Sequence, residues 1–249
     1  MPPRLHVDTP LAPGAELALP PNATRHVQVL RLQPGDALTL FDGQGGQWQA
    51  EVLAMGRREV TARAIAHEAR DLELPQPVTL APGMPANERM DTLIEKATEL
   101  GAAAIVPLMT ERSVLRVAGE RAERKAAHWQ AVAVSACEQS GRNRVPAIAA
   151  PQPLAAWLPG ALAAAGPGAR GLQLSLDATA PPLRSLVDAA PAGTHWVLLS
   201  GPEGGLSPAE QQAAARAGFA PVSLGPRVLR ADTAPLAALA VIAALAAGA

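Results

Sequence analysis

The spacing of apolar residues changes near residue 72 and divides the chain into two parts. Before that point, short apolar runs bounded by turn residues predict strands at residues 17–19, 37–41, 48–53 and 59–66. A glycine-rich turn at residues 42–46 joins two of these runs into a hairpin. Short strands with little helix favour a small β-barrel over residues 1–72.

One helix is predicted among these strands. Asn22 is expected to cap its start, and Val27 and Leu30 are expected to face the core. The opposite face then carries the cations Arg25, His26 and Arg31. A segment with two prolines, residues 71–77, follows as the linker to the second part of the chain.

In the second part, residues 73–249, strands alternate with helices. Apolar runs predict strands at residues 78–81, 103–107, 172–176 and 195–199. Helical spacing predicts helices at residues 90–100 and 119–139, and Ser207 with Glu210 forms a capping box at the start of another. This alternation is typical of an α/β domain with a largely parallel sheet, whose ligands bind beyond the carboxyl ends of the strands.

Two glycine turns lie at that edge of the predicted sheet, SGPEGG at residues 200–205 and LGPRVLR at residues 224–230. Glycine is needed where the backbone takes positive φ or closely approaches a ligand, so the pair suggests a pocket walled by main chain. A P-loop is excluded because Leu206 and Ser207 follow the last glycine, and the glycine spacing also excludes a dinucleotide fingerprint. Turns that serve only strand-to-helix packing are the alternative.

Composition restricts the partners. The formal net charge of −1 indicates that any nucleic-acid surface must be local. The single cysteine, Cys137, excludes an internal disulfide and favours a reducing compartment, and the N-terminus lacks the apolar core of a signal peptide, so we expect a cytoplasmic protein. The histidines have no ligand-like spacing, so no metal is expected.

The uncharged segment at residues 233–249 is too short and too alanine-rich for a membrane anchor. We therefore expect no membrane association. A helix that is apolar on all sides must instead be covered by its own domain or by a second copy of the chain.

The two glycine turns extend to GPEGGLSPAE and LGPRVLRADTA, and together they resemble the cofactor end of the SPOUT class of RNA methyltransferases. More narrowly, the chain is similar to the small-subunit ribosomal RNA methyltransferase E family, which methylates N3 of a uracil in 16S rRNA. Three other stretches carry the same resemblance: RHVQVLRLQPGD at residues 25–36, KATELGA at 96–102 and ACEQSGRNRVP at 136–146. The similarity runs through nearly the whole chain.

This resemblance implies a PUA-like RNA-binding β-barrel over residues 1–72 and a SPOUT α/β methyltransferase domain with a deep trefoil knot over residues 73–249. It also implies S-adenosyl-L-methionine as methyl donor, 16S rRNA as substrate, and a homodimer. The near-neutral charge favours rRNA within the assembled small ribosomal subunit. A SPOUT methyltransferase acting on another structured RNA and a non-catalytic RNA-binding assembly factor are the alternatives.

The chain departs from the family pattern at three sites. Asp177-Ala178 stand where the family often has His-Pro, and Ala86-Asn87 where it usually has a basic residue and glycine. Asp232 stands where glutamate is more usual. The first departure concerns a wall of the cofactor pocket and the second concerns an RNA contact.

The family resemblance places the cofactor against the two glycine turns and the strand before them. For Glu203, contact with the nucleotide, contact with the RNA and bonding to the amides of its own turn are open alternatives. The expected cofactor-binding residues are Leu174, Leu176, Leu199, Ser200, Gly201, Glu203, Gly204, Gly205, Leu224, Gly225, Val228 and Leu229.

Two catalytic residues are expected, Arg230 and Asp232. Uracil N3 is protonated and weakly nucleophilic, so its methylation needs a group that accepts the proton or stabilises the anion. We expect Arg230 to stabilise the negative charge on the uracil oxygens, and Asp232 to orient that guanidinium or act as base. Because Asp232 immediately precedes Thr233, capping of the final helix is the alternative.

RNA binding is expected from cations on loops and helix faces. Each cation alone is more typical of solvated surface charge, and its recurrence in a family-like motif is what favours an RNA role. The candidates are Arg25, His26, Arg31, Arg112, Arg142 and Arg144. Arg89 and Lys96 lie seven residues apart on one helical face and are candidates for an RNA or dimer contact.

Overall fold

The computed structural model describes residues 2–86, 89–177 and 179–246, which form two compact units. Unit 1 comprises Met1–Leu72 with Val134–Val145, and unit 2 comprises Glu73–Ala133 with Pro146–Ala249. Residues 134–145, which the sequence analysis placed in the second domain, therefore group with unit 1.

Unit 1 holds a five-stranded sheet in the order β1-β3-β4-β5-β2. β1 runs parallel to β3, and the other neighbouring strands are antiparallel. Its elements in chain order are β1 (Arg4–His6), β2 (Glu16–Ala18), α1 (Pro21–Val29), β3 (Ala37–Phe41), β4 (Gln47–Met55) and β5 (Val60–Glu68).

The core of unit 1 follows from side-chain alternation along the strands. Leu38 and Leu40 of β3 lie on one face because they are two residues apart, and Ala50 and Val52 of β4 lie on the same side. All four are buried, together with Val27 of α1. The predicted strands at residues 37–41 and 48–53 are thus confirmed.

Two details of the predicted first helix are wrong. α1 begins after Pro20, no side chain caps it, and Asn22 lies inside the helix. Leu30 is 46% exposed, because the helix ends at Val29 and the chain turns to a positive φ of 57° at Arg31. The side chain of Leu30 therefore leaves the face that buries Val27.

Unit 2 contains a six-stranded parallel sheet in the order β13-β11-β12-β6-β7-β9, and a short parallel pair, β10-β8. Its strands are β6 (Val78–Pro82), β7 (Ala104–Ile105), β8 (Leu108–Met109), β9 (Ala147–Ile148), β10 (Gln152–Pro153), β11 (Arg170–Leu174), β12 (Trp196–Ser200) and β13 (Phe219–Val222). Its helices are α2 (Arg89–Glu99), α4 (Leu154–Trp157), η1 (Leu158–Gly160), α5 (Ala161–Ala165), α6 (Leu183–Asp188), α7 (Pro208–Arg216) and α8 (Thr233–Ala246). A further helix, α3 (Glu120–Ser140), begins in unit 2 and ends in unit 1.

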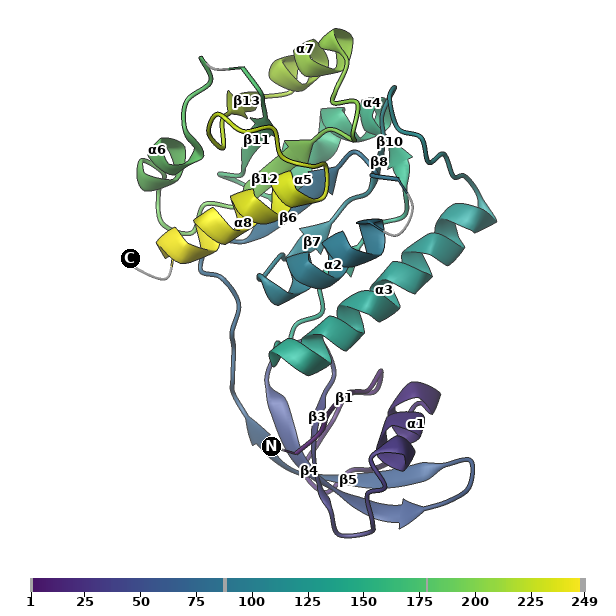
Figure 1. Cartoon of the computed structure of the whole chain (residues 1–249). Helices are drawn as coiled ribbons and strands as arrows, with labels where there is room; N and C mark the ends of the chain where they lie inside the picture. Colours follow the sequence, from purple (N-terminus) through teal and green to yellow (C-terminus); the bar gives the residue numbers. More distant parts are fainter. Residues whose placement is uncertain (1, 87–88, 178, 247–249) are drawn as a thin grey trace. The chain divides into compact units, whose positions relative to one another are not determined.

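Helices cover both faces of this sheet. α8 packs on β6, β12 and α2, and Figure 1 shows α8 and α2 over one face. The other face buries Val197 and Leu199 of β12 together with Leu154, Leu158 and Phe219. All five residues of β12 are buried, which explains its uninterrupted apolar run.

Most predicted elements of unit 2 are confirmed, with shifted ends. α2 ends before Gly101, whose φ is +98°, and α7 starts with the predicted capping box of Ser207 and Glu210. The strand predicted at residues 103–107 is reduced to β7, and β11 ends at Leu174 rather than at residue 176. The two residues after β11 leave the sheet and line the cavity described next.

Candidate functional site

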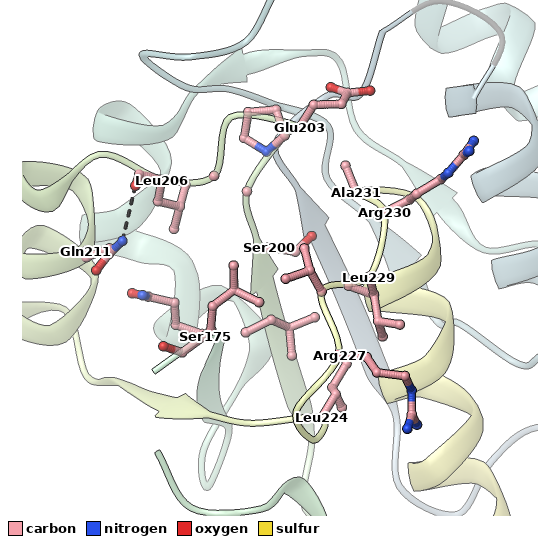
Figure 2. A pocket seen from close by; sticks show the side chains of 18 of the residues that line it. Ser175, Ser200, Glu203, Leu206, Gln211, Leu224, Arg227, Leu229, Arg230 and Ala231 are labelled. Carbon is pink, nitrogen blue, oxygen red and sulfur yellow. Dashed lines mark hydrogen bonds between the residues drawn. The ribbon is translucent and has the colours of Figure 1, made fainter. Parts of the chain in front are cut away.

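A cavity of about 410 Å³ lies at the carboxyl ends of β11 and β12, where three loops meet (Figure 2). The loop after β11 contributes Ser175 and Leu176, and the loop between β12 and α7 contributes the first glycine turn. The loop between β13 and α8 contributes the second. This is the edge at which ligands bind to parallel sheets.

The first glycine turn is packed against its own backbone. A Cβ on Gly201 would stand 2.7 Å from the carbonyl carbon of Gly205 and from the nitrogen of Leu206. Gly205 has a φ of +68°, and its N–H donates to the carbonyl of Pro202 at 2.8 Å. Any side chain at Gly201 would push the turn open, so the wall of the cavity here is main chain.

The turn continues into α7, whose first residues also border the cavity. Figure 2 shows the amide of Gln211 donating to the carbonyl of Leu206, at 3.1 Å. The Ser207 hydroxyl accepts from the Glu210 N–H, and the Glu210 carboxylate accepts from the Ser207 N–H at 2.9 Å. These bonds fix the loop at its helical end.

The second glycine turn is more open. Gly225 has a φ of +104°, and its N–H donates to the Ser223 hydroxyl at 3.1 Å. Leu224 and Leu229 line the cavity, while Val228 is 78% exposed. This loop therefore presents apolar side chains to a ligand and to solvent.

Ser200 is an unusual member of the cavity wall. The residue is 2% exposed, and its hydroxyl finds no hydrogen-bond partner among the described residues. A buried hydroxyl without a partner costs about 1–3 kcal/mol. A polar ligand group that reached this hydroxyl would remove that cost.

Glu203 joins two loops at the mouth of the cavity. Its carboxylate accepts from the N–H of Ala86 at 3.1 Å and pairs with Arg89, which also lines the cavity, at 3.2 Å. One alternative for Glu203 was a bond to the amides of its own turn. In the structure its carboxylate instead bonds the segment that contains Ala86 and Arg89. Asn87 lies outside the described residues.

The cavity brings together most of the expected cofactor-binding residues: Leu174, Leu176, Ser200, Gly201, Glu203, Gly205, Leu224, Gly225, Val228 and Leu229. Two do not line it. The Leu199 side chain is fully buried in the sheet core, and Gly204 faces Arg112, whose Cβ would be 3.1 Å from a Cβ at that glycine.

Sequence reasoning missed other lining residues, some within the glycine motifs and some outside them. Gln173 is buried within β11, and Gln211 belongs to α7. The remaining missed residues are Arg89, Ser175, Pro202, Leu206, Arg227, Ala231 and Ala234. Adjacency to the motifs was an available signal for all of these except Arg89 and Gln173.

Of the two expected catalytic residues, Arg230 lines the cavity and Asp232 does not. Arg230 is exposed and forms no ion pair with the described residues, and in Figure 2 its side chain extends away from the loop. A carboxylate oxygen of Asp232 accepts from the N–H of Thr233 at 3.1 Å, at the start of α8. An N-cap side chain accepts from the second or third helical N–H, so this bond to the next residue leaves both alternatives for Asp232 open.

The expected RNA-binding cations occupy different environments. Arg25, His26 and Arg31 are exposed on and just after α1. Arg112 donates to the carbonyl of Gly204 at 2.7 Å, and Arg144 pairs with Asp71 at 3.4 Å while its side chain stays 53% exposed.

Arg142 is the exception and corrects the sequence analysis. It is only 3% exposed, because the loop that carries it is folded into unit 1. Arg4 anchors this loop by donating to the carbonyl of Arg142 at 3.1 Å and to the Asn143 side chain at 2.6 Å. A buried guanidinium cannot reach an RNA phosphate from this position, so we leave it out of the RNA-binding set.

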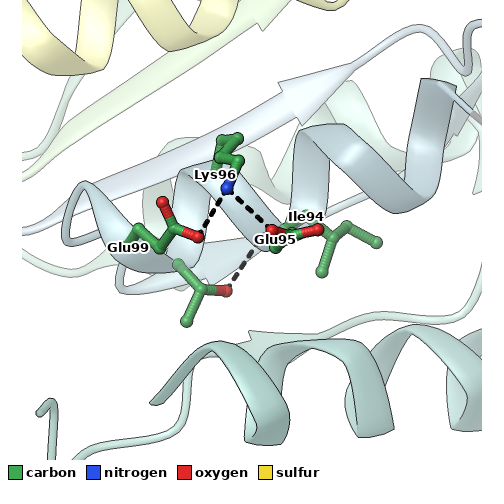
Figure 3. Close-up of polar contacts among 5 residues, drawn as sticks. Ile94, Glu95, Lys96 and Glu99 are labelled. Carbon is green, nitrogen blue, oxygen red and sulfur yellow. Dashed lines mark hydrogen bonds and ion pairs between the residues drawn. The ribbon is translucent and has the colours of Figure 1, made fainter. Parts of the chain in front are cut away.

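Lys96 is held within α2. Figure 3 shows its ammonium between Glu95, at 2.7 Å, and Glu99, at 2.8 Å. Hydrogen bonds to these two carboxylates raise the pKa of Lys96. The charge is matched locally, so Lys96 is a weaker candidate for a phosphate contact than the cations without acidic partners.

The loop after β11 contains a side-chain turn. Asp177 accepts from the N–H and the hydroxyl of Thr179, at 2.8 and 2.7 Å, and these bonds lower the pKa of Asp177. Asp177 and Ala178 stand where the family often has His-Pro, and Ala178 lies outside the described residues. The Asp177 carboxylate therefore fixes the loop after β11, directly after Leu176, which lines the cavity.

Within residues 2–86, 89–177 and 179–246, no group of three or more metal-ligating side chains comes together. None of the helices described there is long and apolar enough to cross a membrane. Cys137 is fully buried, and its thiol lies 3.5 Å from the carbonyl of Arg144.

Comparison with known proteins identifies both parts of the chain. Residues 72–243 match the family described as RNA methyltransferase domain, and residues 19–65 match the RNA methyltransferase PUA domain. Ribosomal RNA small subunit methyltransferase E of Synechocystis sp. is 40% identical over 88% of this chain and 69% of its own length. The protein of that name from Bacillus subtilis is 31% identical over 87% of this chain and 84% of its own.

Two solved structures are similar along almost their whole length. A ribosomal RNA small subunit methyltransferase E from Neisseria gonorrhoeae, bound to S-adenosyl methionine, has 35% identity and a TM-score of 0.88, with 98% of each chain covered. A putative methyltransferase from Legionella pneumophila, in complex with the same cofactor, has 33% identity and a TM-score of 0.89, again with 98% of each chain covered. The chain therefore belongs to the RNA methyltransferase family, among the ribosomal RNA small subunit methyltransferases E.

Proposed function

We propose that this protein transfers a methyl group from S-adenosyl-L-methionine to N3 of a uracil in 16S rRNA. The observation that carries the proposal is the cavity at the carboxyl edge of the parallel sheet, walled by two glycine turns. It occurs in a chain that is 35% identical to a relative crystallised with S-adenosyl methionine.

The residues present suit such a cofactor. The volume of about 410 Å³ is within the range of small-molecule sites. Leu174, Leu224 and Leu229 supply apolar surface for an adenine ring, and main-chain groups near Gly201 and Gly205 supply hydrogen bonds. The unpartnered hydroxyl of Ser200 adds a polar group that a ligand can satisfy.

S-adenosyl-L-methionine, when bound, supplies a methyl group on a sulfonium, which is already activated toward a nucleophile. The protein's task is therefore to hold the uracil nitrogen in line at about 3 Å and to exclude water. The N3 proton must also leave, and the resulting anion must be stabilised.

Arg230 is the residue that we assign to this stabilisation. Arg230 is among the residues that line the cavity, carries no ion pair within the described residues and is exposed. Positive charge aimed at developing negative charge is among the strongest catalytic effects available to a protein. Asp232 is the alternative base, and its carboxylate accepts from the Thr233 N–H in this structure.

We further propose that the substrate is rRNA within the assembled small subunit and that the enzyme works in the cytoplasm as a homodimer with a trefoil knot in unit 2. Arg25, His26, Arg31, Arg112 and Arg144 are the proposed RNA contacts. Support for the dimer comes from α8, where Ala237, Ala240 and Val241 stay partly exposed and Ala244 is exposed.

Methylation assays with labelled cofactor test the proposal. Protein-free 16S rRNA and assembled small subunits are offered separately, and the product is digested and mapped by mass. We expect incorporation at one uracil, at N3, with the assembled subunit preferred. Incorporation only into another structured RNA would replace the substrate assignment, and cofactor binding without incorporation into any RNA would favour the assembly factor.

A further inference from the structure

Helix α1 and the tip of the β4–β5 hairpin are joined by side-chain bonds. The amide of Gln28 donates to the carbonyls of Gly56 and Arg57, at 3.1 and 3.3 Å. Both elements belong to unit 1, and both lie within the PUA match at residues 19–65. The two segments therefore form one continuous surface.

Arginines cluster on this surface. Arg57 and Arg58 occupy the hairpin tip between Gly56 and Glu59, where the Gly56 N–H donates to the Glu59 carbonyl at 2.8 Å. Arg25 precedes Gln28 by three residues, a spacing that places both on one face of the helix, next to the tip. Arg31 follows the end of the same helix. We call Arg25, Arg31, Arg57 and Arg58 the four-arginine surface.

Their charge is uncompensated within the described part of the chain. All four are exposed, and none forms an ion pair there. The acidic residues of these segments do not neutralise them: Asp36 accepts from the Gln33 N–H at 2.7 Å, and Glu59 makes no ion pair with a described residue. Two exposed arginines elsewhere, Arg124 and Arg184, do have carboxylate partners, at 3.2 Å.

Arg31 also stands in a backbone conformation that arginine seldom adopts. The N–H of Arg31 donates to the Gln28 carbonyl at 3.1 Å, and the N–H of Leu32 donates to the Val27 carbonyl at 3.2 Å. This is a Schellman ending, in which the left-handed position usually holds glycine. Here it is Arg31, with a φ of 57°. A strained residue kept at the surface suggests that its side chain has a function.

We infer that the four-arginine surface is a phosphate-binding face of unit 1 that docks the enzyme on the backbone of its rRNA substrate. The inference rests on the proposed function and adds Arg57 and Arg58 to the RNA contacts. RNA is favoured over an acidic protein because the surface lies in an RNA methyltransferase PUA domain and consists of arginines, which bind phosphate oxygens.

Equilibrium binding of the full chain to purified small ribosomal subunits, measured from 50 to 300 mM salt, tests this inference. Each phosphate contact contributes a slope of about −0.9 to log affinity against log salt. The double variant Arg57→Gln/Arg58→Gln should therefore bind roughly 30-fold more weakly at 0.15 M salt, with a slope shallower by about 2. Cofactor affinity should be unchanged.

The matched control is Arg124→Gln/Arg184→Gln, which removes the same charge from two arginines whose side chains are 71% and 75% exposed and ion-paired. Its affinity and slope should follow those of the wild type. If both double variants behave alike, the inference is overturned.

Substitution of Arg31 should change thermal stability and binding affinity in opposite directions. Arg31→Gly should raise Tm by about 2–4 °C, because glycine relieves the left-handed strain, yet weaken binding about fivefold. Arg31→Lys should retain most of the affinity. If Arg31→Gly binds like the wild type, Arg31 does not belong to the surface, whatever its Tm.

Binding to protein-free 16S rRNA distinguishes the two kinds of partner. A loss of affinity for both the naked RNA and the intact subunit supports the inference. A loss seen only with the intact subunit would place an acidic ribosomal protein on this surface and overturn it. Normal binding by the wild type without methyl transfer would instead count against the proposed function alone.

Discussion

The hydroxyl of Ser200 is a buried polar group at the candidate cofactor cavity, and no described residue forms a hydrogen bond with it. The rest of β12 is apolar, so a serine at this position is not explained by packing. A hydrogen bond with the cofactor would offset the free-energy cost of burying this hydroxyl. Cofactor affinity should therefore depend on the Ser200 hydroxyl.

Ser200→Ala should therefore have opposite effects on stability and binding. We expect Tm of the cofactor-free protein to rise by about 2–4 °C, and the Kd of S-adenosyl-L-methionine to increase about 2- to 10-fold. Thermal melts and calorimetric titration measure the two. The matched control is Ser140→Ala, since the Ser140 hydroxyl in α3 is also buried and has no partner among the residues that the structure describes. It should raise Tm and leave Kd unchanged.

Arg230 and Arg227 allow a comparison within one loop, because both line the cavity and both are exposed. If Arg230 stabilises the uracil anion, Arg230→Ala should lower kcat by about 100-fold with little change in cofactor Kd. Arg227→Ala should have a much smaller effect on kcat. Equal turnover by Arg230→Ala and the wild type would remove this role.

Asp232 can be assigned by comparing two substitutions. Asparagine can still accept the Thr233 N–H but cannot act as base, whereas alanine can do neither. From the observed bond, we expect Asp232→Asn to retain turnover and Asp232→Ala to lose about 1 kcal/mol of stability. A large drop in kcat for Asp232→Asn would show that the carboxylate is the base.

At the scale of elements, α2 and α3 are held together by one carboxylate. Asp91 of α2 accepts from the indole N–H of the buried Trp129 at 2.8 Å and pairs with His128 at 2.7 Å. Burial raises the pKa of Asp91, but the bonds from His128 and Trp129 outweigh it, and the net shift is downward. Because this pKa is lower in the folded protein, the ionised carboxylate stabilises the fold at pH values above the pKa of aspartate in the unfolded chain, near 3.9. The stabilisation is lost as the pH falls through the lower pKa of the folded state.

Asp91→Asn should therefore destabilise the protein by about 1 kcal/mol at neutral pH, a value reduced for partial exposure of the pair. The difference from the wild type should shrink below about pH 4, because the wild-type carboxylate becomes protonated there. Urea unfolding at several pH values measures it. The exposed Glu120→Gln is the control, and a pH-independent difference for Asp91→Asn would contradict the electrostatic explanation.

The helices and strands also show which features of secondary structure can be predicted from neighbouring residues. The capping box of Ser207 and Glu210 was predictable because its partners are three residues apart. The Asn22 cap was not, since prolines at the start of α1 set where that helix begins. The short strand pair β8–β10 carried no periodic signal, because two-residue strands are shorter than any alternation.

At the scale of the whole molecule, α8 combines two surfaces. One face buries Ala238, Leu239 and Ile242 in unit 2, as expected for an uncharged helix. The other leaves small apolar residues partly or fully exposed. An apolar helix face of this kind suits close packing against a second copy, which agrees with the proposed homodimer.

Ala244→Glu tests that packing without disturbing the protomer, since Ala244 is exposed in the single chain. We expect the substitution to convert the dimer to monomer in sedimentation experiments, because a carboxylate cannot be buried unpaired at an interface. Ala163→Glu, on the exposed side of α5, should leave the oligomeric state unchanged. A variant Ala244→Glu that remains dimeric would exclude this face.

The sequence predicted the part of the candidate site that is formed by main-chain groups near the glycine motifs. Gly201 and Gly205 were identified from sequence because only glycine fits the close backbone approach and the positive φ found there. The burial of Arg142 was not predictable from local sequence, because its loop is bonded to Arg4, which lies far away in the sequence.

The sequence by itself determined the alternation of strands and helices, the two glycine turns and the family, because these are written in neighbouring residues. Only the tertiary structure decided that the Ser200 hydroxyl has no partner in the described part of the chain, that Glu203 pairs with Arg89, and that Gln28 joins α1 to a hairpin tip. Each of these depends on groups that are distant along the chain, and their distances are set by packing rather than by local propensity.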